Sequence, residues 1–123
     1  MTGETEVGRL TTHVLDLAAG KPAAGLALTL LAIRDGKSVE VAEAMTNADG
    51  RIDKPLLEGA SLQPGTYELR FQAGTYFDRQ GLELPEPKFL DEVVLRFGIA
   101  SADQHYHVPL LLSPFGYSTY RGS

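Results

Sequence analysis

A strict alternation of side chains across residues 105–112 limits what this part of the chain can become. Successive residues of a strand point to opposite faces, so every second residue shares a face. One face of this stretch is wholly apolar and is expected to lie in the core: Tyr106, Val108, Leu110 and Leu112. The other face is mixed: His105, His107, Pro109 and Leu111. It is too apolar to face water and too rich in histidine to be plain core, so we expect it to meet another surface across a site.

This strand is expected to end in a tight hairpin. Ser113-Pro114 interrupts the ladder because proline has no N–H to donate, and residues 115–120 then resume as the partner strand. Alternation and turn signals predict further strands over 10–17, 24–33, 38–45, 51–55, 66–72 and 91–100. The strand at 51–55 is expected to be short. One short helix is predicted over 74–80, and residues 58–65 are predicted to be loop. About eight short strands indicate an all-β fold, a two-sheet β-sandwich.

The strand predicted over 66–72 shows which side of a sheet faces water. Its inward residues are apolar: Tyr67, Leu69 and Phe71. Its outward residues are polar and are expected to be solvated, as in a half-exposed antiparallel strand: Glu68, Arg70 and Gln72.

Length and composition favour one domain over residues 1–123, with residues 1–8 as a flexible N-terminus. A chain of 123 residues buries roughly two thirds of its unfolded surface on folding, which is enough for one core. The sequence has no cysteine, which excludes a disulfide framework, a thiolate nucleophile and a cysteine-based zinc site. A net charge of −5 with scattered arginines leaves no basic surface for nucleic acid.

No segment suits a membrane or secretion. The longest apolar run, residues 26–33, is far shorter than the about 20 residues that span a bilayer. The first six residues are acidic and lack the apolar stretch of a secretory signal. We therefore expect a cytoplasmic protein with neither nucleic acid nor membrane as a partner.

Two motifs at opposite ends of the chain carry a resemblance to a known family. Near the C-terminus stand Tyr106-His107-Val108-Pro109, Leu112-Ser113-Pro114-Phe115-Gly116-Tyr117-Ser118 and Tyr120-Arg121-Gly122-Ser123. Near the N-terminus, His13-Val14-Leu15-Asp16 precedes Gly20-Lys21-Pro22-Ala23. Together these motifs resemble the transthyretin-related 5-hydroxyisourate hydrolases, and they frame nearly the whole chain. The resemblance implies a transthyretin-like sandwich.

The resemblance also implies an activity. It predicts a hydrolase that opens the ring of 5-hydroxyisourate at a cyclic amide, giving 2-oxo-4-hydroxy-4-carboxy-5-ureidoimidazoline in the breakdown of urate. No cofactor is required. The implied catalytic residues are His13, Arg51 and His107. The implied substrate-binding residues are those of the tail, Tyr120, Arg121, Gly122 and Ser123. The family further implies a homotetramer, a dimer of dimers, with the site at a subunit interface.

The residue types suit this chemistry. A histidine, with a pKa near 6.5, is the natural group to move a proton at neutral pH. Either His107 or His13 could take a proton from the attacking water. Arg51 would then stabilise the oxyanion, since a guanidinium offers a planar fork of donors. His105 is expected to support the site from its rim.

Each of these residues also has a structural interpretation. A strand histidine can satisfy a carbonyl, Arg51 could be an exposed turn residue, and the tail could be a frayed end. The hormone-carrying transthyretins have threonine in place of His107 and lysine in place of His13, which favours a hydrolase over a small-molecule or hormone carrier on the same fold. A metal site is not expected, because only His105 and His107 are closely spaced and no acidic residue adjoins them.

Overall fold

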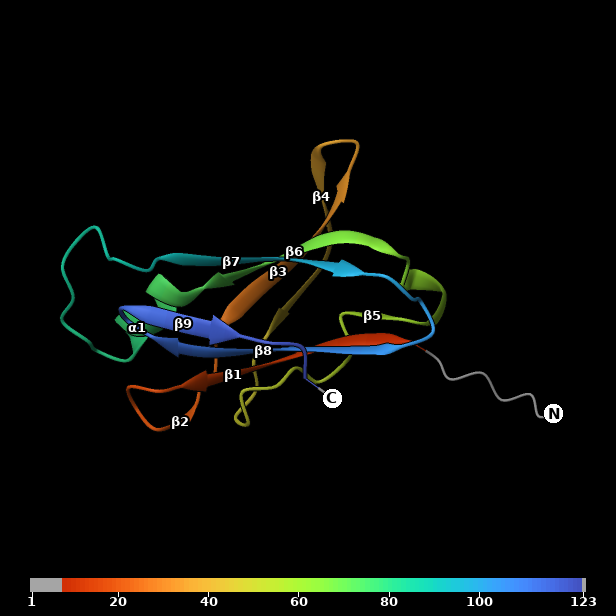
Figure 1. The fold of residues 1–123 in the computed structure, drawn as a ribbon. Helices are drawn as coiled ribbons and strands as arrows, with labels where there is room; N and C mark the ends of the chain where they lie inside the picture. Colours follow the sequence, from red (N-terminus) through yellow and green to blue (C-terminus); the bar gives the residue numbers. More distant parts are fainter. Residues whose placement is uncertain (1–7, 123) are drawn as a thin grey trace.

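The computed structural model describes residues 8–122, and this part of the chain forms two β-sheets packed face to face (Figure 1). The elements in chain order are β1 (Arg9–Asp16), β2 (Lys21–Pro22), β3 (Ala27–Arg34), β4 (Lys37–Met45), β5 (Leu57–Glu58), η1 (Gly59–Ser61), β6 (Gly65–Gln72), α1 (Ala73–Arg79), β7 (Glu92–Ile99), β8 (His105–Ser113) and β9 (Gly116–Thr119). Two of these nine strands, β2 and β5, have only two residues each. The predicted all-β, two-sheet sandwich with one short helix is confirmed.

The two sheets differ in strand order and in the direction of one strand pairing. Sheet A has the order β2-β1-β8-β9, with β5 also paired to β1, and sheet B has the order β4-β3-β6-β7. The pairing of β1 with β8 is parallel, whereas the other pairings of named strands are antiparallel. This parallel pair lies in the middle of sheet A and brings a strand from the N-terminal part of the chain beside one from the C-terminal part. Both sequence motifs therefore lie in one sheet.

Alternate residues of the two sheets fill the space between them. The predicted core face of β8 is buried throughout: Tyr106, Val108, Leu110 and Leu112. Facing residues from sheet B are buried as well: Leu28, Leu30, Tyr67, Leu69, Phe71, Val93, Leu95 and Ile99. Burying one such large side chain stabilises the fold by about 1.5–3 kcal/mol relative to leaving it exposed. This shared core fixes the two sheets against each other.

A buried polar contact ties the end of β1 to the helix. Asp16 is 3% exposed, and its carboxylate accepts hydrogen bonds from the Tyr76 hydroxyl at 2.7 Å and the Ala19 N–H at 2.9 Å. Burial and the neighbouring Asp16 raise the pKa of Tyr76, so the phenol stays protonated and donates. The strand that carries His13 is thereby anchored at its C-terminal end.

The prediction of a strand over 51–55 was wrong, and the prediction of a loop over 58–65 was wrong in part. No strand forms over 51–55, where Arg51 makes only an isolated bridge with His13. The predicted loop at 58–65 instead begins with β5 and the short helix η1. Contacts with the start of β1 decide this, because the Leu56 N–H donates to the Leu10 carbonyl at 2.8 Å and the Gly59 N–H donates to the Gly8 carbonyl at 2.9 Å.

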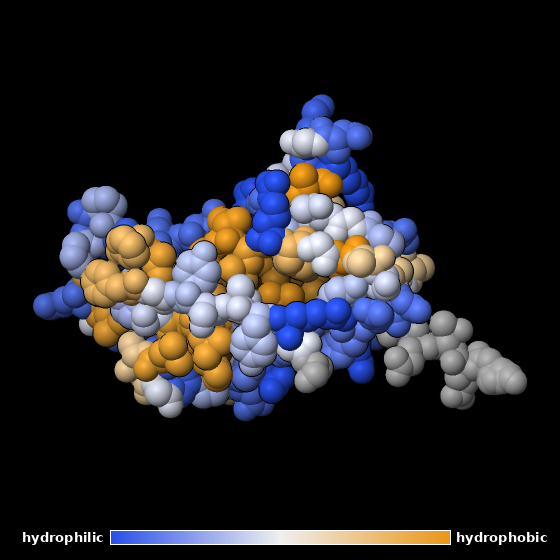
Figure 2. Space-filling view, in the orientation of Figure 1, coloured by the Kyte–Doolittle hydropathy of each residue, from blue (hydrophilic) through white to orange (hydrophobic). Residues whose placement is uncertain are grey.

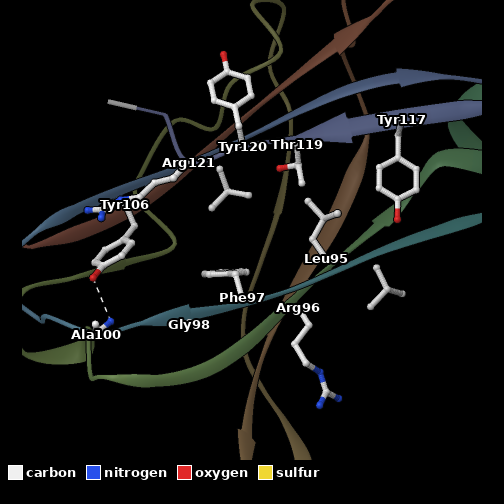
Figure 3. A pocket seen from close by; sticks show the side chains of 12 residues that line it. Leu95, Arg96, Phe97, Gly98, Ala100, Tyr106, Tyr117, Thr119, Tyr120 and Arg121 are labelled. Carbon is white, nitrogen blue, oxygen red and sulfur yellow. Dashed lines mark hydrogen bonds between the residues drawn. The ribbon is translucent and has the colours of Figure 1, made fainter.

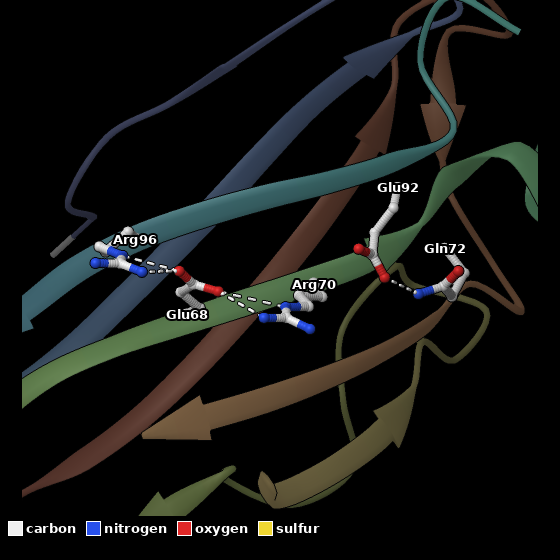
Figure 4. A network of polar contacts seen from close by, with 5 residues as sticks. All are labelled: Glu68, Arg70, Gln72, Glu92 and Arg96. Carbon is white, nitrogen blue, oxygen red and sulfur yellow. Dashed lines mark hydrogen bonds and ion pairs between the residues drawn. The ribbon is translucent and has the colours of Figure 1, made fainter. Parts of the chain in front are cut away.

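Glu68 also departs from its prediction as a solvated residue. It points away from the core, yet it is only 6% exposed. Two arginines cover it, with Arg96 Nη2 2.6 Å from Oε2 and Arg70 Nη2 3.0 Å from Oε1 (Figure 4). The alternation gave the correct face of β6, but burial on that face depends on side chains from β6 and the neighbouring β7.

The predicted flexible segment 1–8 lies outside the described residues except for Gly8, which is buried. In the part of the chain that the structure describes, no helix has the length and apolar character needed to cross a membrane. Apolar side chains are visible where the edge strands β7 and β9 face each other across the sandwich (Figure 2).

Candidate active site

The parallel pairing of β1 with β8 builds a cluster of side chains on the outer face of sheet A. Its register places Thr11 opposite His107 and His13 opposite Pro109. Because alternate residues share a face, these side chains all point away from the core. The ring centroids of His13 and His107 lie 6.3 Å apart. Two histidines from opposite ends of the sequence are therefore neighbours.

A tight turn delivers Arg51 to the same face. The Asn47 side chain accepts hydrogen bonds from the N–H groups of Asp49 at 2.9 Å and Arg51 at 3.2 Å. Gly50 follows with a φ of +74°, and its carbonyl accepts the Val14 N–H at 2.8 Å. A Cβ on Gly50 would lie 2.4 Å from the Val14 carbonyl oxygen. Only glycine fits this close approach, which sets Arg51 opposite β1.

The C-terminal tail is tied to His107 through its backbone. The Gly122 N–H donates to the His107 carbonyl at 2.7 Å, and the two residues form an isolated bridge. A Cβ on Gly122 would lie 2.7 Å from Cδ2 of His107, so the imidazole occupies the space that a side chain would need. Tyr120 lies beside the same cluster, while Ser123 lies outside the described residues.

Arg121 lies in a different neighbourhood from the rest of the tail. Its guanidinium carbon is 4.1 Å from the centroid of the Tyr106 ring. The guanidinium donates to the Gln104 side-chain oxygen at 3.1 Å and to the His105 carbonyl at 3.2 Å. Figure 3 shows Arg121 reaching over Tyr106, with the Tyr120 ring on the opposite side of the sheet from Tyr106. Arg121 therefore fastens the tail to the segment before and within β8.

The cluster surrounds a cavity of about 540 Å³. The predicted site residues that line it are His13, Arg51, His107, Tyr120 and Gly122. Further lining comes from Arg9, Thr11, Thr12, Leu15, Ile52, His105, Pro109 and Leu111. A cavity of this volume with convergent polar groups is typical of a small-molecule site.

A second cavity of about 580 Å³ lies at the open edge between the sheets, bordered by β7 and β9. Its lining is mostly apolar and aromatic, and includes Phe97, Tyr106 and Tyr117 together with Arg96 and Arg121 (Figure 3). The slightly larger volume of this second cavity does not make it the better candidate for an active site. We assign the candidate site to the cavity on the outer face of sheet A because, of the two, it contains the titratable histidines.

Burial and a facing cation favour the neutral form of both central histidines. Burial is the main cause that lowers the pKa of His107, and the positive charge of Arg51 adds to it, followed by His13 and His105. Burial and then Arg51 also lower the pKa of His13, while a hydrogen bond to the backbone of Asp49 and the charge of Asp49 act in the opposite direction. A neutral imidazole has a free lone pair, as a general base requires.

Thr11 is a site residue that sequence analysis missed. Its hydroxyl oxygen lies 2.8 Å from Nδ1 of His107 and 3.0 Å from Nε2 of His105. The alternation of β1 already placed Thr11 on the same face as His13. Alternation alone could not identify Thr11 as a site residue, because it does not give the register between β1 and β8.

Comparison with known proteins identifies the family. The pattern described as "HIUase/Transthyretin family" matches residues 10–122. The chain belongs to this family. The resemblance drawn from the two motifs is therefore confirmed. A relative within the HIUase/Transthyretin family, the 5-hydroxyisourate hydrolase of Pseudomonas aeruginosa, is 58% identical over 118 residues, which are 95% of this chain and 93% of the relative.

Solved structures show the same fold. The crystal structure of (S)-allantoin synthase superposes with a TM-score of 0.91 at 42% identity, covering 100% of this chain but only 46% of that chain. This member of the HIUase/Transthyretin family thus corresponds to less than half of the synthase. Sea bream transthyretin in complex with thyroxine superposes with a TM-score of 0.83 at 30% identity, covering 93% of this chain and 94% of that chain. The predicted transthyretin-like sandwich is confirmed.

Metal ligands were not expected from the sequence. Within residues 8–122, no group of three His, Cys, Asp or Glu side chains is arranged to hold a metal ion. The hydroxyl of Thr11, rather than a carboxylate, lies between His105 and His107. A metal-free reaction stays a prediction.

Proposed function

We propose that this chain hydrolyses 5-hydroxyisourate to 2-oxo-4-hydroxy-4-carboxy-5-ureidoimidazoline, a step of urate breakdown. The Pseudomonas aeruginosa relative bears the name of this hydrolase at 58% identity over almost its whole length. One observation carries the proposal: a single cavity gathers His13, Arg51, His107 and the tail from four separate segments. That combination provides a base, an oxyanion partner and a substrate rim in one place.

The proposed base is His107. Its Nδ1 lies 2.8 Å from the Thr11 hydroxyl, so Nε2 is the nitrogen left for water in the cavity. The lowered pKa of His107 keeps the imidazole neutral at pH 7, ready to take a proton as water attacks the ring carbonyl. His13 faces it across the cavity and can accept a second hydrogen bond from the same water. Proton transfer by a positioned group typically contributes about 10²–10⁴-fold.

Arg51 is proposed to stabilise the oxyanion that forms during the attack. The Gly50 turn fixes its backbone against β1, next to His13. A preorganised cation loses little order when the charge develops, and removing one such donor typically costs about 10²–10³-fold in turnover. Its positive charge also lowers the pKa of both histidines, which couples the two roles.

The tail is proposed to form the substrate-binding rim. Tyr120 and Gly122 line the cavity, and Ser123 would follow at the end of the chain. Arg121 belongs to this group through its backbone. Its side chain would hold the tail in place by its contacts with Tyr106 and Gln104.

A carrier on the same fold is the alternative. Sea bream transthyretin binds thyroxine and shares the sandwich, but at 30% identity it is more distant than the hydrolase relative at 58%. The positions of His13 and His107, which are lysine and threonine in the carriers, also favour the hydrolase.

We further propose a homotetramer built as a dimer of dimers. The edge strands β7 and β9, together with the turn before β9, leave large apolar side chains exposed, among them Val94, Phe115 and Tyr117. Exposed apolar edges favour pairing with a second copy. The cavity face with Leu15 and Leu111 would form the second interface and place the site between subunits. Light scattering should give the mass of four 13.3 kDa chains, and a fully active single chain would contradict this assembly.

The direct test uses freshly prepared 5-hydroxyisourate and follows its decay by absorbance. The chain should accelerate the decay in proportion to its concentration. His107→Ala and His13→Ala should each lower turnover at least about a hundredfold without loss of folding. No acceleration, together with tight binding of thyroxine, would instead support the carrier.

The proposed mechanism uses no cofactor. Treatment with a chelator should therefore leave the rate unchanged, and a rate restored by added metal would revive a metal-dependent reaction. The cytoplasmic location expected from the sequence stays a prediction, which fractionation of cells would check.

A further inference from the structure

One hydroxyl group lies between two histidines in the cavity. The Thr11 oxygen is 2.8 Å from Nδ1 of His107 and 3.0 Å from Nε2 of His105, both within hydrogen-bond distance. The parallel register sets this geometry, because Thr11 pairs with His107 and Arg9 pairs with His105. His107 is half-buried beside the cavity, whereas His105 is exposed. The hydroxyl therefore connects an inner imidazole to an outer one.

The hydrogen count of this group allows only two neutral arrangements. A hydroxyl has one proton to donate and can accept another. In the first arrangement, His107 Nδ1–H donates to the Thr11 oxygen, and the Thr11 hydroxyl donates to His105 Nε2. In the second, both hydrogen bonds run the other way. The first arrangement leaves Nε2 of His107 bare, as a base requires, and the second leaves a proton on that nitrogen, as an acid requires.

We propose that His107, Thr11 and His105 form a proton relay, in which His105 takes up the Thr11 proton when His107 takes a proton from the attacking water. The inference rests on the proposed hydrolase function and adds two residues to it. Thr11 and His105 act through His107, so both are positioning and relay residues that need not touch the substrate.

Each step of the relay balances. Water forms a bond to the ring carbonyl carbon, and its proton passes to His107 Nε2. In the same step, the Nδ1 proton of His107 moves to the Thr11 oxygen and the Thr11 proton moves to His105 Nε2. When the ring C–N bond breaks, His107 gives its Nε2 proton to the leaving nitrogen and the relay runs backwards. The resting arrangement is restored, and the new carboxylic acid ionises into solvent.

The surroundings favour moving the positive charge outward. His107 is faced by Arg51 from the turn, by His13 from β1 and by His105 from its own strand. No Asp or Glu is among the described residues that line the cavity. An imidazolium at His107 would therefore sit beside another cation.

The outer histidine has cations of its own nearby. Arg9 lies opposite it in the register, and the Arg121 guanidinium contacts its carbonyl. His105 is nevertheless exposed, and water screens charges there far better than around the half-buried His107.

The test uses three variants of the full chain. Thr11→Val removes the hydroxyl at nearly constant shape, Thr11→Ser keeps it, and His105→Gln keeps a hydrogen-bonding side chain that cannot store a proton. Thr29→Val on β3 of sheet B is the matched control for loss of a strand threonine. We expect Thr11→Val and His105→Gln to lower kcat by about tenfold with little change in KM, less than the about 10²–10⁴-fold of a general base. Thr11→Ser and Thr29→Val should keep wild-type kcat.

A proton inventory separates a relay from a structural role. The kcat of the wild type and of Thr11→Ser should depend on the deuterium fraction of the solvent along a curve, because several protons move together. The dependence should become linear in Thr11→Val and His105→Gln. A linear wild-type inventory, or wild-type kcat in both relay variants, would overturn the relay. A wild-type chain that fails to accelerate the reaction would overturn the proposed function instead.

Discussion

The outer faces of the two sheets both carry charged side chains, but only one face neutralises them. On sheet B, Glu68 lies between Arg70 and Arg96 with N–O distances of 3.0 and 2.6 Å (Figure 4). On sheet A, Arg51 faces two histidines, and the described residues that line the cavity include no Asp or Glu. Among the residues that line this cavity no carboxylate pairs with Arg51, and the charge of Asp49, which acts on His13, comes from outside the lining.

The difference separates a structural network from a candidate site. Hydrogen bonds from Arg96 and then Arg70 lower the pKa of Glu68, which keeps the carboxylate ionised between β6 and β7. On sheet A, burial and Arg51 lower the pKa of His13 and His107, which keeps both bases neutral. Perturbed groups without a neutralising partner are typical of catalytic sites, whereas paired groups are typical of stabilising networks.

Replacing one arginine on each face should give the largest contrast. Arg51→Ala should lower kcat/KM on 5-hydroxyisourate by about 10²–10³-fold, because the oxyanion loses its cation. Arg96→Ala should leave kcat/KM near the wild-type value and lower the melting temperature, because Glu68 loses its shorter ion pair. Both side chains are exposed, so the two variants are matched. Equal losses of activity in the two would remove the distinction between the faces.

Adding one methyl group to the tail should give a smaller effect. In Gly122→Ala the new Cβ would lie 2.7 Å from His107 Cδ2, so the imidazole must move. We expect kcat to fall about tenfold, since a displacement of about 1 Å can cost up to 10²-fold. Gly98→Ala on β7 is the control, because its Cβ would meet nothing within 4 Å. Steady-state rates and melting curves for both variants would show whether the tail positions the base, and unchanged kcat in Gly122→Ala would show that it does not.

The pH dependence of stability should differ slightly between the faces. In the folded chain the pKa values of His13 and His107 lie below 6.5, the ordinary value that these histidines have in the unfolded chain. As pH falls, the unfolded chain therefore takes up these protons first, and the free energy of unfolding decreases below about pH 6.5. The lowered pKa of Glu68 gives a second loss only below its ordinary value of 4.5. The histidines make their full contribution to the free energy of unfolding above about pH 6.5, and Glu68 makes its full contribution above about pH 4.5.

Melting temperatures measured across pH would resolve the two losses. The double variant His13→Asn/His107→Asn should flatten the curve just below pH 6.5, and Glu68→Gln should flatten it below about 4.5. If the double variant kept the wild-type slope below pH 6.5, the histidines would not be the groups that titrate there.

Periodicity was a good guide to the long strands. The apolar face of β8 and the inward residues of β6 are buried as predicted, because a two-residue period follows from backbone geometry alone. The prediction of a strand at 51–55 was wrong because contacts with another segment, rather than a repeating pattern, decide its structure. Its pattern was short, and the Gly50 contact with Val14 holds this segment against β1 by one bridge rather than a ladder. Short segments take their structure from their neighbours.

The candidate site was predictable where the family resemblance named its residues. His13, Arg51, His107, Tyr120 and Gly122 do meet around one cavity. Arg121 was expected beside the substrate, but the structure places its guanidinium over Tyr106. A motif gives the identity of a residue and not the direction of its side chain, which depends on the groups that lie within reach.

The sequence by itself determined the all-β class, the core face of β8 and the family, because alternation and motifs are local properties of the chain. The tertiary structure alone decided that Thr11 lies between His105 and His107, that Glu68 is buried by two arginines, and that the Gly122 backbone contacts His107. Except for the Arg70–Glu68 contact within β6, each of these contacts depends on the register or packing of different segments. No pattern within one segment contains that information, because register is set only when the core of both sheets closes.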